Sequence, residues 1–223
     1  MGGILAVVAH PDDETLGCGG TLALHASTGS EVGVLCLTCA PPGRHTEIEN
    51  ACAELGVTDL EVLKASEIPR SKELVKKISD MIVSAKPEVV ITHLPYDYHA
   101  NHREAHEVVS EAVEWAAHTT TYEEPWRVRR LLLMEISTLI PTPHIIVDIS
   151  GAISRKKAAV AMYTSQLAKF PWGYYERLTD RKAELRGIQG GCSYAEAFIE
   201  ETLARNSPFY QSKSVKSLLG DKP

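Results

Sequence analysis

The chain has 223 residues, 44% of them hydrophobic and 23% charged, a balance typical of a globular protein that can bury a core. Its formal net charge is −6 and it has no run rich in Lys and Arg, which argues against a nucleic-acid partner. No apolar stretch reaches the roughly 18 residues that suggest a membrane span, and the N-terminus has no features of a signal peptide, so we expect a cytoplasmic protein.

Apolar runs alternate with amphipathic segments along the first half of the chain. We expect strands over 4–9, 31–38, 60–64 and 88–93, and helices over 21–28, 47–55, 71–86 and 103–117. The second half is less regular, with strands expected over 130–137 and 144–150 and helices over 151–166 and 174–187. This order predicts an α/β fold, a doubly wound, mostly parallel, Rossmann-like sheet with helices on both faces. No repeat or linker is visible, so 1–223 is expected to form a single domain.

The motif AHPDDE (9–14) places four ionisable side chains directly after the first expected strand: His10, Asp12, Asp13 and Glu14. Like charges this close repel one another, and a divalent cation would offset the repulsion. His and Asp are both zinc ligands. The alternative is a helix N-terminus, where capping and the helix dipole favour acids, but it leaves His10 unexplained. The glycines that follow (17–20) match no phosphate-binding motif and indicate close packing of a helix against a strand.

A second cluster follows the fourth expected strand, in HLPYDYHANHREAH (93–106). It contains His93, Asp97, His99, His102 and His106. Strands one and four of a doubly wound sheet commonly lie side by side, so the two polar loops should face each other across a crevice. Together they would form one metal site. His106 could share a helix face with His102, but a position on the helix surface or behind the ligands explains it better.

These motifs resemble those of the LmbE-like, or PIG-L, family of zinc-dependent N-deacetylases. AHPDDE (9–14) is similar to the first motif of the family, and PYDYHANH (95–102) is similar to the second, whose core is H-x-x-H. RHTEIENACAELGV (44–57), YTSQ (163–166) and YAEAF (194–198) resemble further family segments, so the resemblance extends along most of the chain. One departure is Asn101, which stands where the common H-P-D-H motif has an acid.

The resemblance implies a role for each of eight residues. His10, Asp13 and His102 become the ligands of Zn²⁺, and Asp12 becomes the general base that takes a proton from metal-activated water. His99, with Asp97 as its partner, becomes the residue that stabilises or protonates the reacting centre. Arg44 would contact the substrate or the developing charge. Tyr194 could supply the oxyanion contact that some members make with a Tyr at position 97.

The implied reaction removes the N-acetyl group from an N-acetylglucosamine-type sugar or conjugate, releasing acetate and a primary amine. Two alternatives stay open at this point. One is hydrolysis of another amide-linked sugar conjugate, of the mycothiol type. The other is non-catalytic sugar binding on the same fold. The expected partner is a small N-acetylated sugar, without nucleic acid or a membrane span, and homo-oligomers are frequent in the family.

Overall fold

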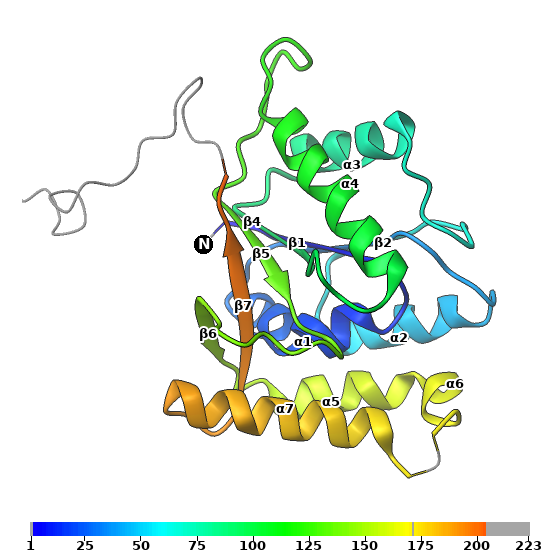
Figure 1. Cartoon of the computed structure of the whole chain (residues 1–223), viewed down its shortest axis with the longest axis vertical. Helices are drawn as coiled ribbons and strands as arrows, with labels where there is room; N and C mark the ends of the chain where they lie inside the picture. Colours follow the sequence, from blue (N-terminus) through cyan, green and yellow to red (C-terminus); the bar gives the residue numbers. More distant parts are fainter. Residues whose placement is uncertain (1, 171, 204–223) are drawn as a thin grey trace, which may run out of the picture.

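The computed structural model describes residues 2–170 and 172–203. Within these residues the chain builds a seven-stranded sheet in the order β3-β2-β1-β4-β5-β7-β6 (Figure 1). The strands are β1 (Ile4–Val8), β2 (Val32–Cys36), β3 (Asp59–Val62), β4 (Val89–His93), β5 (Arg130–Met134), β6 (Ile145–Asp148) and β7 (Ala195–Glu201). The five neighbouring strands β3, β2, β1, β4 and β5 pair in parallel, whereas β7 pairs antiparallel with both β5 and β6. The predicted fold class is confirmed.

Helices cover both faces of the sheet. In the described ranges they are α1 (Asp13–Ser27), α2 (Arg44–Leu55), α3 (Lys72–Ala85), α4 (Ala100–Ala116), α5 (Ile153–Met162), α6 (Thr164–Leu167) and α7 (Tyr174–Gly190). The helices α3 and α4 pack together on one face, and α1, α2 and α5 on the other, with α7 beside α5 at the bottom of Figure 1. Along β1, Ile4 and Val8 join the core under α1, whereas Leu5 and Val7 join the core under α4, as the period of two requires.

Helix α1 begins at Asp13, well before the predicted start at residue 21. The glycines of segment 17–20 have low helix propensity, which is why the sequence pattern favoured a later start. Their lack of a side chain is required by packing. A Cβ on Gly17 would lie 2.3 Å from Sδ of Met134, and one on Gly20 would lie 2.6 Å from Cδ1 of Ile149. The segment therefore lies inside the helix and allows it to approach the sheet closely.

Strand β7 is missing from the sequence prediction, which treated residues 194–198 only as a motif. Its position is fixed by Glu196, whose buried carboxylate accepts hydrogen bonds of 2.8 Å from the backbone N–H groups of Gly20 and Thr21. The buried ammonium of Lys156 donates to the same carboxylate. This ion pair connects β7 and α5 to the middle of α1. The expected helix over 151–166 is also divided, ending at Met162 and resuming as α6.

The pairing of β1 with β4 decides where the polar loops lie. These strands are parallel neighbours in the sheet, as predicted, with Ile4 opposite Val89. Both loops therefore leave the same edge of the sheet, at the carboxyl ends of the two strands, where ligands bind in folds of this type. No described helix is both long enough and apolar enough to cross a membrane.

Candidate metal centre

The loop after β1 turns sharply at Asp12. This residue has φ 112° and ψ −27°, a region that costs a non-glycine residue about 1–3 kcal/mol. Its backbone N–H donates to Oε2 of Glu14 at 3.1 Å, and its carbonyl accepts from the N–H groups of Thr15 and Leu16 at 3.1 and 2.8 Å. These contacts hold the turn and start α1 at Asp13. Strained positions of this kind cluster at functional sites.

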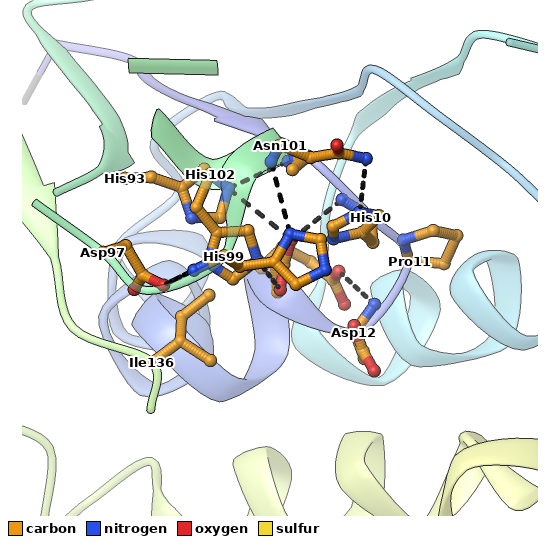
Figure 2. A network of polar contacts seen from close by, with 12 residues as sticks. His10, Pro11, Asp12, His93, Asp97, His99, Asn101, His102 and Ile136 are labelled. Carbon is orange, nitrogen blue, oxygen red and sulfur yellow. Dashed lines mark hydrogen bonds and ion pairs between the residues drawn. The ribbon is translucent and has the colours of Figure 1, made fainter. Parts of the chain in front are cut away.

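The loop after β4 is held by the first turn of α4. Nδ1 of His99 accepts a hydrogen bond from the N–H of Asn101 at 3.3 Å and so caps the helix. The N–H of His99 donates to Oδ1 of Asp97 at 2.9 Å, and Arg103 donates to the Asp97 carbonyl at 2.6 Å. With the loop fixed in this way, the ring of His102 faces the loop that carries His10 (Figure 2).

The side chains of His10, Asp13 and His102 converge where the two loops meet. Nδ1 of His10 lies 3.2 Å from Oδ2 of Asp13, and Nε2 of His102 lies 3.4 Å from Oδ1 of the same carboxylate. In a tetrahedral zinc site with bonds of about 2.0–2.1 Å, neighbouring ligand atoms lie about 3.3–3.4 Å apart. One carboxylate and two imidazoles are a donor set that zinc uses, and each imidazole nitrogen lies at about this spacing from a different oxygen of Asp13.

Two further imidazoles stand beside these donors. Among the described residues, the His/Cys/Asp/Glu groups close enough to hold a metal are His10–His99–His102 and Asp13–His93–His102. His102 belongs to both groups, whereas His10 and Asp13 belong to different ones. The rings of His99 and His102 stack with centroids 4.8 Å apart. The candidate centre is thus a connected set of donors at the junction of the two loops, with His102 in its middle.

His93, the last residue of β4, lies behind the ligands. Its ring stacks on His102 with centroids 4.2 Å apart, and its Nε2 accepts the N–H of Ala9 at 2.9 Å. Burial, with the neighbouring His102, lowers the pKa of His93 to about 3, so the ring is neutral. Because the amide already uses the Nε2 lone pair, His93 is better placed to pack than to bind a metal. The sequence pattern included this residue in the cluster but offered no role for it.

Asp97 faces His102 and not the ring of His99. Its Oδ1 lies 3.2 Å from Nδ1 of His102, on the side of the ring opposite to Asp13, and it meets His99 through the backbone. Burial raises the pKa of Asp97, but hydrogen bonds with His102 and His99 bring it below its usual value. Burial acts against the charged form of His102 as well and lowers its pKa. Asp13 and Asp97 outweigh this effect and raise the pKa of His102 to about 10. A carboxylate behind a metal-binding imidazole orients the ring and increases its basicity.

Asp12 and Arg44 form a buried ion pair. Nη2 of Arg44 lies 3.0 Å from Oδ2 of Asp12 and also donates to the carbonyl of Pro11. Burial and the neighbouring Asp13 raise the pKa of Asp12 well above its usual value, and Arg44 opposes that shift. In Figure 2 the Asp12 side chain points away from the histidines, toward the layer formed by the C-terminal helices. Arg44, the first residue of α2, thus supplies the positive charge that faces Asp12.

Asn101 contacts His10 from the opposite loop. Its Nδ2 lies 3.0 Å from Nε2 of His10, the ring nitrogen that faces away from Asp13 (Figure 2). An amide can present either its oxygen or its nitrogen at this position, so it can accept a proton from His10 when Nδ1 binds a metal. The Asn that departs from the common motif therefore still supplies a partner for the imidazole.

Glu14 is a structural residue that sequence reasoning left without a role. Its carboxylate is fully buried. Oε2 accepts from the backbone of Asp12, and Oε1 accepts from the hydroxyl groups of Thr15 and Tyr163. Tyr163 begins the segment YTSQ, so this segment supports the strained turn that carries the candidate base.

Comparison with known proteins assigns the fold and its two loops to a family. The family profile described as PIG-L: GlcNAc-PI de-N-acetylase matches residues 5–113, which include both loops of the candidate centre. The diacetylchitobiose deacetylase of Thermococcus kodakarensis is 29% identical over 231 residues, covering 92% of this chain and 86% of the relative. The conserved protein TT1542 from Thermus thermophilus is 30% identical, with a TM-score of 0.82, covering 95% of this chain and 100% of that chain. The chain belongs to the PIG-L family.

A second solved structure extends the similarity of fold to a different activity. GalB, the 4-carboxy-2-hydroxymuconate hydratase from Pseudomonas putida KT2440, has a TM-score of 0.80 at 22% identity, covering 94% of this chain and 100% of that chain. This protein shows a shared fold alone, and one fold can support different chemistries. The function of this PIG-L member must therefore be argued from its site.

Two of the residues considered from the sequence lie away from the PIG-L motif residues. Tyr194 contacts Ser150 through its backbone, and its ring lies 5.5 Å from Nζ of Lys157. These contacts are with the loop after β6 and with α5, not with the candidate ligands. Nε2 of His106 lies 2.8 Å from Oε2 of Glu201, so its described partner is on β7. Only 13% of the His106 side chain is exposed, so it faces β7 and not the candidate ligands.

Proposed function

We propose that this protein is a zinc-dependent hydrolase that removes the acetyl group from an N-acetylglucosamine-type sugar or sugar conjugate. The observation that carries the proposal is the position of the Asp13 carboxylate between two imidazoles, 3.2 Å from Nδ1 of His10 and 3.4 Å from Nε2 of His102. Three protein ligands leave the fourth position of a tetrahedral ion for water or substrate, which is the arrangement of a catalytic zinc site. Membership of the PIG-L family supports the same reaction.

His10, Asp13 and His102 are the proposed ligands. A zinc ion bound there would lower the pKa of water and polarise the amide carbonyl. Asp97 and Asn101 hold the far sides of the two imidazoles, at 3.2 Å from His102 and 3.0 Å from His10. The protein thereby fixes which ring nitrogen of each histidine faces the ion.

Asp12 is the proposed general base. Two observations support this role: the AHPDDE motif resembles the first motif of the family, and the strained turn holds Asp12 next to the proposed ligand Asp13. Burial raises the pKa of Asp12, and a more basic carboxylate accepts a proton from water more readily. Arg44, paired with Asp12 at 3.0 Å, opposes this shift and favours the ionised carboxylate. The proton that Asp12 accepts is the one that the departing amine nitrogen must finally receive.

His99 is proposed to bind the oxygen of the amide carbonyl as negative charge develops on it. Its ring stands at the edge of the centre, 4.8 Å from the ring of His10 between centroids, and is partly exposed. Burial and the neighbouring His102 lower the pKa of His99. A hydrogen-bond donor aimed at developing charge stabilises the transition state. Completion of the reaction breaks the C–N bond and yields acetate and the amine.

The decisive experiment measures acetate and free amine together. Zinc-loaded protein is incubated with N-acetylglucosamine, diacetylchitobiose and an inositol-linked N-acetylglucosamine. Equal amounts of acetate and amine are expected from at least one of them, and Asp12→Asn serves as the control for contaminating hydrolases. Binding of these sugars without release of either product would support non-catalytic sugar binding instead and would contradict the proposal.

A further inference from the structure

An aromatic cluster stands at the beginning of α7. It consists of Phe170, Trp172, Tyr174 and Tyr175, whose rings contact one another with centroids 5.2 to 6.3 Å apart. Trp172 is 57% exposed and Phe170 is 39% exposed. Side chains of this size normally bury most of their surface, so a contiguous exposed group indicates a binding surface.

The aromatic cluster lies beside the candidate centre. The helix α6 just before it is held to the start of α2 by hydrogen bonds from Ser165 to Glu47 at 2.7 Å. Figure 1 shows α6 and the first turn of α7 under the end of α2 that carries Arg44. Burial raises the pKa of Tyr175 to about 12, and the charge of Asp12 contributes to that shift. The cluster and the buried proposed base therefore lie in one region of the molecule.

A further aromatic residue stands on the loop that carries the histidines. Tyr98 is 70% exposed, and its ring packs edge-on against His99 with centroids 6.0 Å apart. The phenol of Tyr98 is also close enough to Tyr175 to affect its ionisation. Aromatic side chains thus approach the candidate centre from the loop after β4 and from α7.

The chemistry of the aromatic cluster favours a sugar ring over an acyl chain. An acyl chain needs a continuous apolar groove, whereas here charged side chains flank the aromatic ones on both sides in the sequence. They are Lys169, Glu176 and Arg177, and the guanidinium of Arg177 lies 5.9 Å from the Trp172 ring. The faces of aromatic rings carry negative charge and attract the weakly positive C–H groups of a pyranose, while the charged groups can bind its hydroxyls.

We propose that the aromatic cluster binds a second pyranose ring attached to the N-acetylglucosamine unit, so that the substrate is an N-acetylated disaccharide or a longer oligosaccharide. This inference rests on the proposed deacetylase function. It assigns Trp172 as the main stacking surface because its ring is the most exposed of the four, and it makes Tyr98 the residue that contacts the oligosaccharide from the other side.

The test compares a disaccharide with a monosaccharide. Binding of diacetylchitobiose and of N-acetylglucosamine is measured by calorimetry on the zinc-loaded Asp12→Asn protein, with and without Trp172→Ala. We expect Trp172→Ala to reduce the preference for the disaccharide about tenfold, equivalent to about 1.4 kcal/mol. Trp172→Phe should restore most of the preference. The matched control is Trp115→Ala, which removes a 42% exposed tryptophan from α4 and should leave the preference unchanged.

The outcomes separate the two proposals. If wild-type protein releases acetate but Trp172→Ala weakens both sugars equally, or neither, the inference about the second ring is overturned and the deacetylase function stands. If disaccharide binding depends on Trp172 but no sugar is deacetylated, the binding surface stands and the proposed function fails. Trp172-dependent binding to phosphatidylcholine vesicles, with no disaccharide preference, would identify a lipid surface as the partner and overturn the inference.

Discussion

Asp97 and Asp13 lie on opposite sides of one imidazole. Oδ1 of Asp97 is 3.2 Å from Nδ1 of His102, and Oδ1 of Asp13 is 3.4 Å from Nε2 of the same ring. The ring therefore has one nitrogen directed to the candidate metal position and the other next to a carboxylate. This relationship makes Asp97 a positioning residue for a proposed ligand.

Substitution of Asp97 should weaken metal binding. Asp97→Ala removes the carboxylate that orients His102, and losing such a partner typically costs about 10- to 100-fold in metal affinity. The dissociation constant for zinc, measured by competition with a chromogenic chelator, should rise by that amount. Asp80→Ala provides a control, since Asp80 is an exposed carboxylate paired with Lys76 on α3. An unchanged zinc affinity in Asp97→Ala would show that His102 needs no orientation from this residue.

Zinc binding should release a proton. The pKa of His102 is raised to about 10, so near neutral pH its imidazole is protonated in the metal-free protein, whereas a zinc ligand must be neutral. The apparent zinc affinity should therefore rise about tenfold per pH unit from about pH 6 to pH 9, and level off above the pKa. Calorimetry in two buffers with different ionisation enthalpies should count close to one proton released. Binding heats that do not depend on the buffer would contradict this.

His102→Ala should lose both zinc and activity, because two donors hold the ion much less firmly than three. Metal content after dialysis measures the first effect and acetate release the second. His106→Ala is the matched control on the same helix. It removes a histidine paired with Glu201 at 2.8 Å and should keep its zinc. Stoichiometric zinc of unchanged affinity in His102→Ala would remove that residue from the ligand set.

Asp12→Asn should retain zinc while kcat falls about 10²- to 10⁴-fold, the usual weight of general-base catalysis. The amide has nearly the same shape as the carboxylate but cannot accept the proton. Zinc content and kcat are measured on the same preparation. Near-normal turnover would exclude Asp12 as the base, whereas loss of the metal would make it a ligand.

Arg44→Gln should move the acidic limb of kcat/KM to higher pH. Asp12 must be ionised to act as a base, so activity falls as the pH drops through its pKa. Arg44 lowers that pKa, which burial and Asp13 raise, so removing the guanidinium raises it further. A pH–rate profile of the variant beside wild type measures the shift, with thermal unfolding as a check on the folded state. An unmoved limb would show that Arg44 acts only on structure.

The sheet and the two polar loops could be predicted because local patterns carry them. Alternating apolar and amphipathic segments give the order of elements, and the adjacency of β1 and β4 follows from the usual doubly wound topology. The start of α1 could not be predicted, because it depends on two residues far along the chain, Met134 in β5 and Ile149 just after β6, which pack against the glycines of the helix. Propensity alone disfavours a helix there.

The partners of the site residues were harder to predict than their presence. Asp97 is two residues from His99 in the sequence, yet its carboxylate faces His102, because the first turn of α4 brings residue 102 back over the loop. Tyr194 stands in a matching motif, but the loop that carries it lies against β6 and α5. Motif spacing identifies such residues, whereas only the fold determines which atoms they meet.

The contact between Glu14 and Tyr163 has a consequence for biosynthesis. The two residues are separated by 149 positions, and Glu14 in turn holds the strained turn at Asp12. A ribosome delivers the N-terminus first, so the loop with the first candidate ligands emerges long before Tyr163 does. Until then a carboxylate destined for complete burial lacks one of its donors, which is unfavourable in an apolar core. The nascent chain should therefore acquire metal only late in translation, after α5 and Tyr163 have left the exit tunnel.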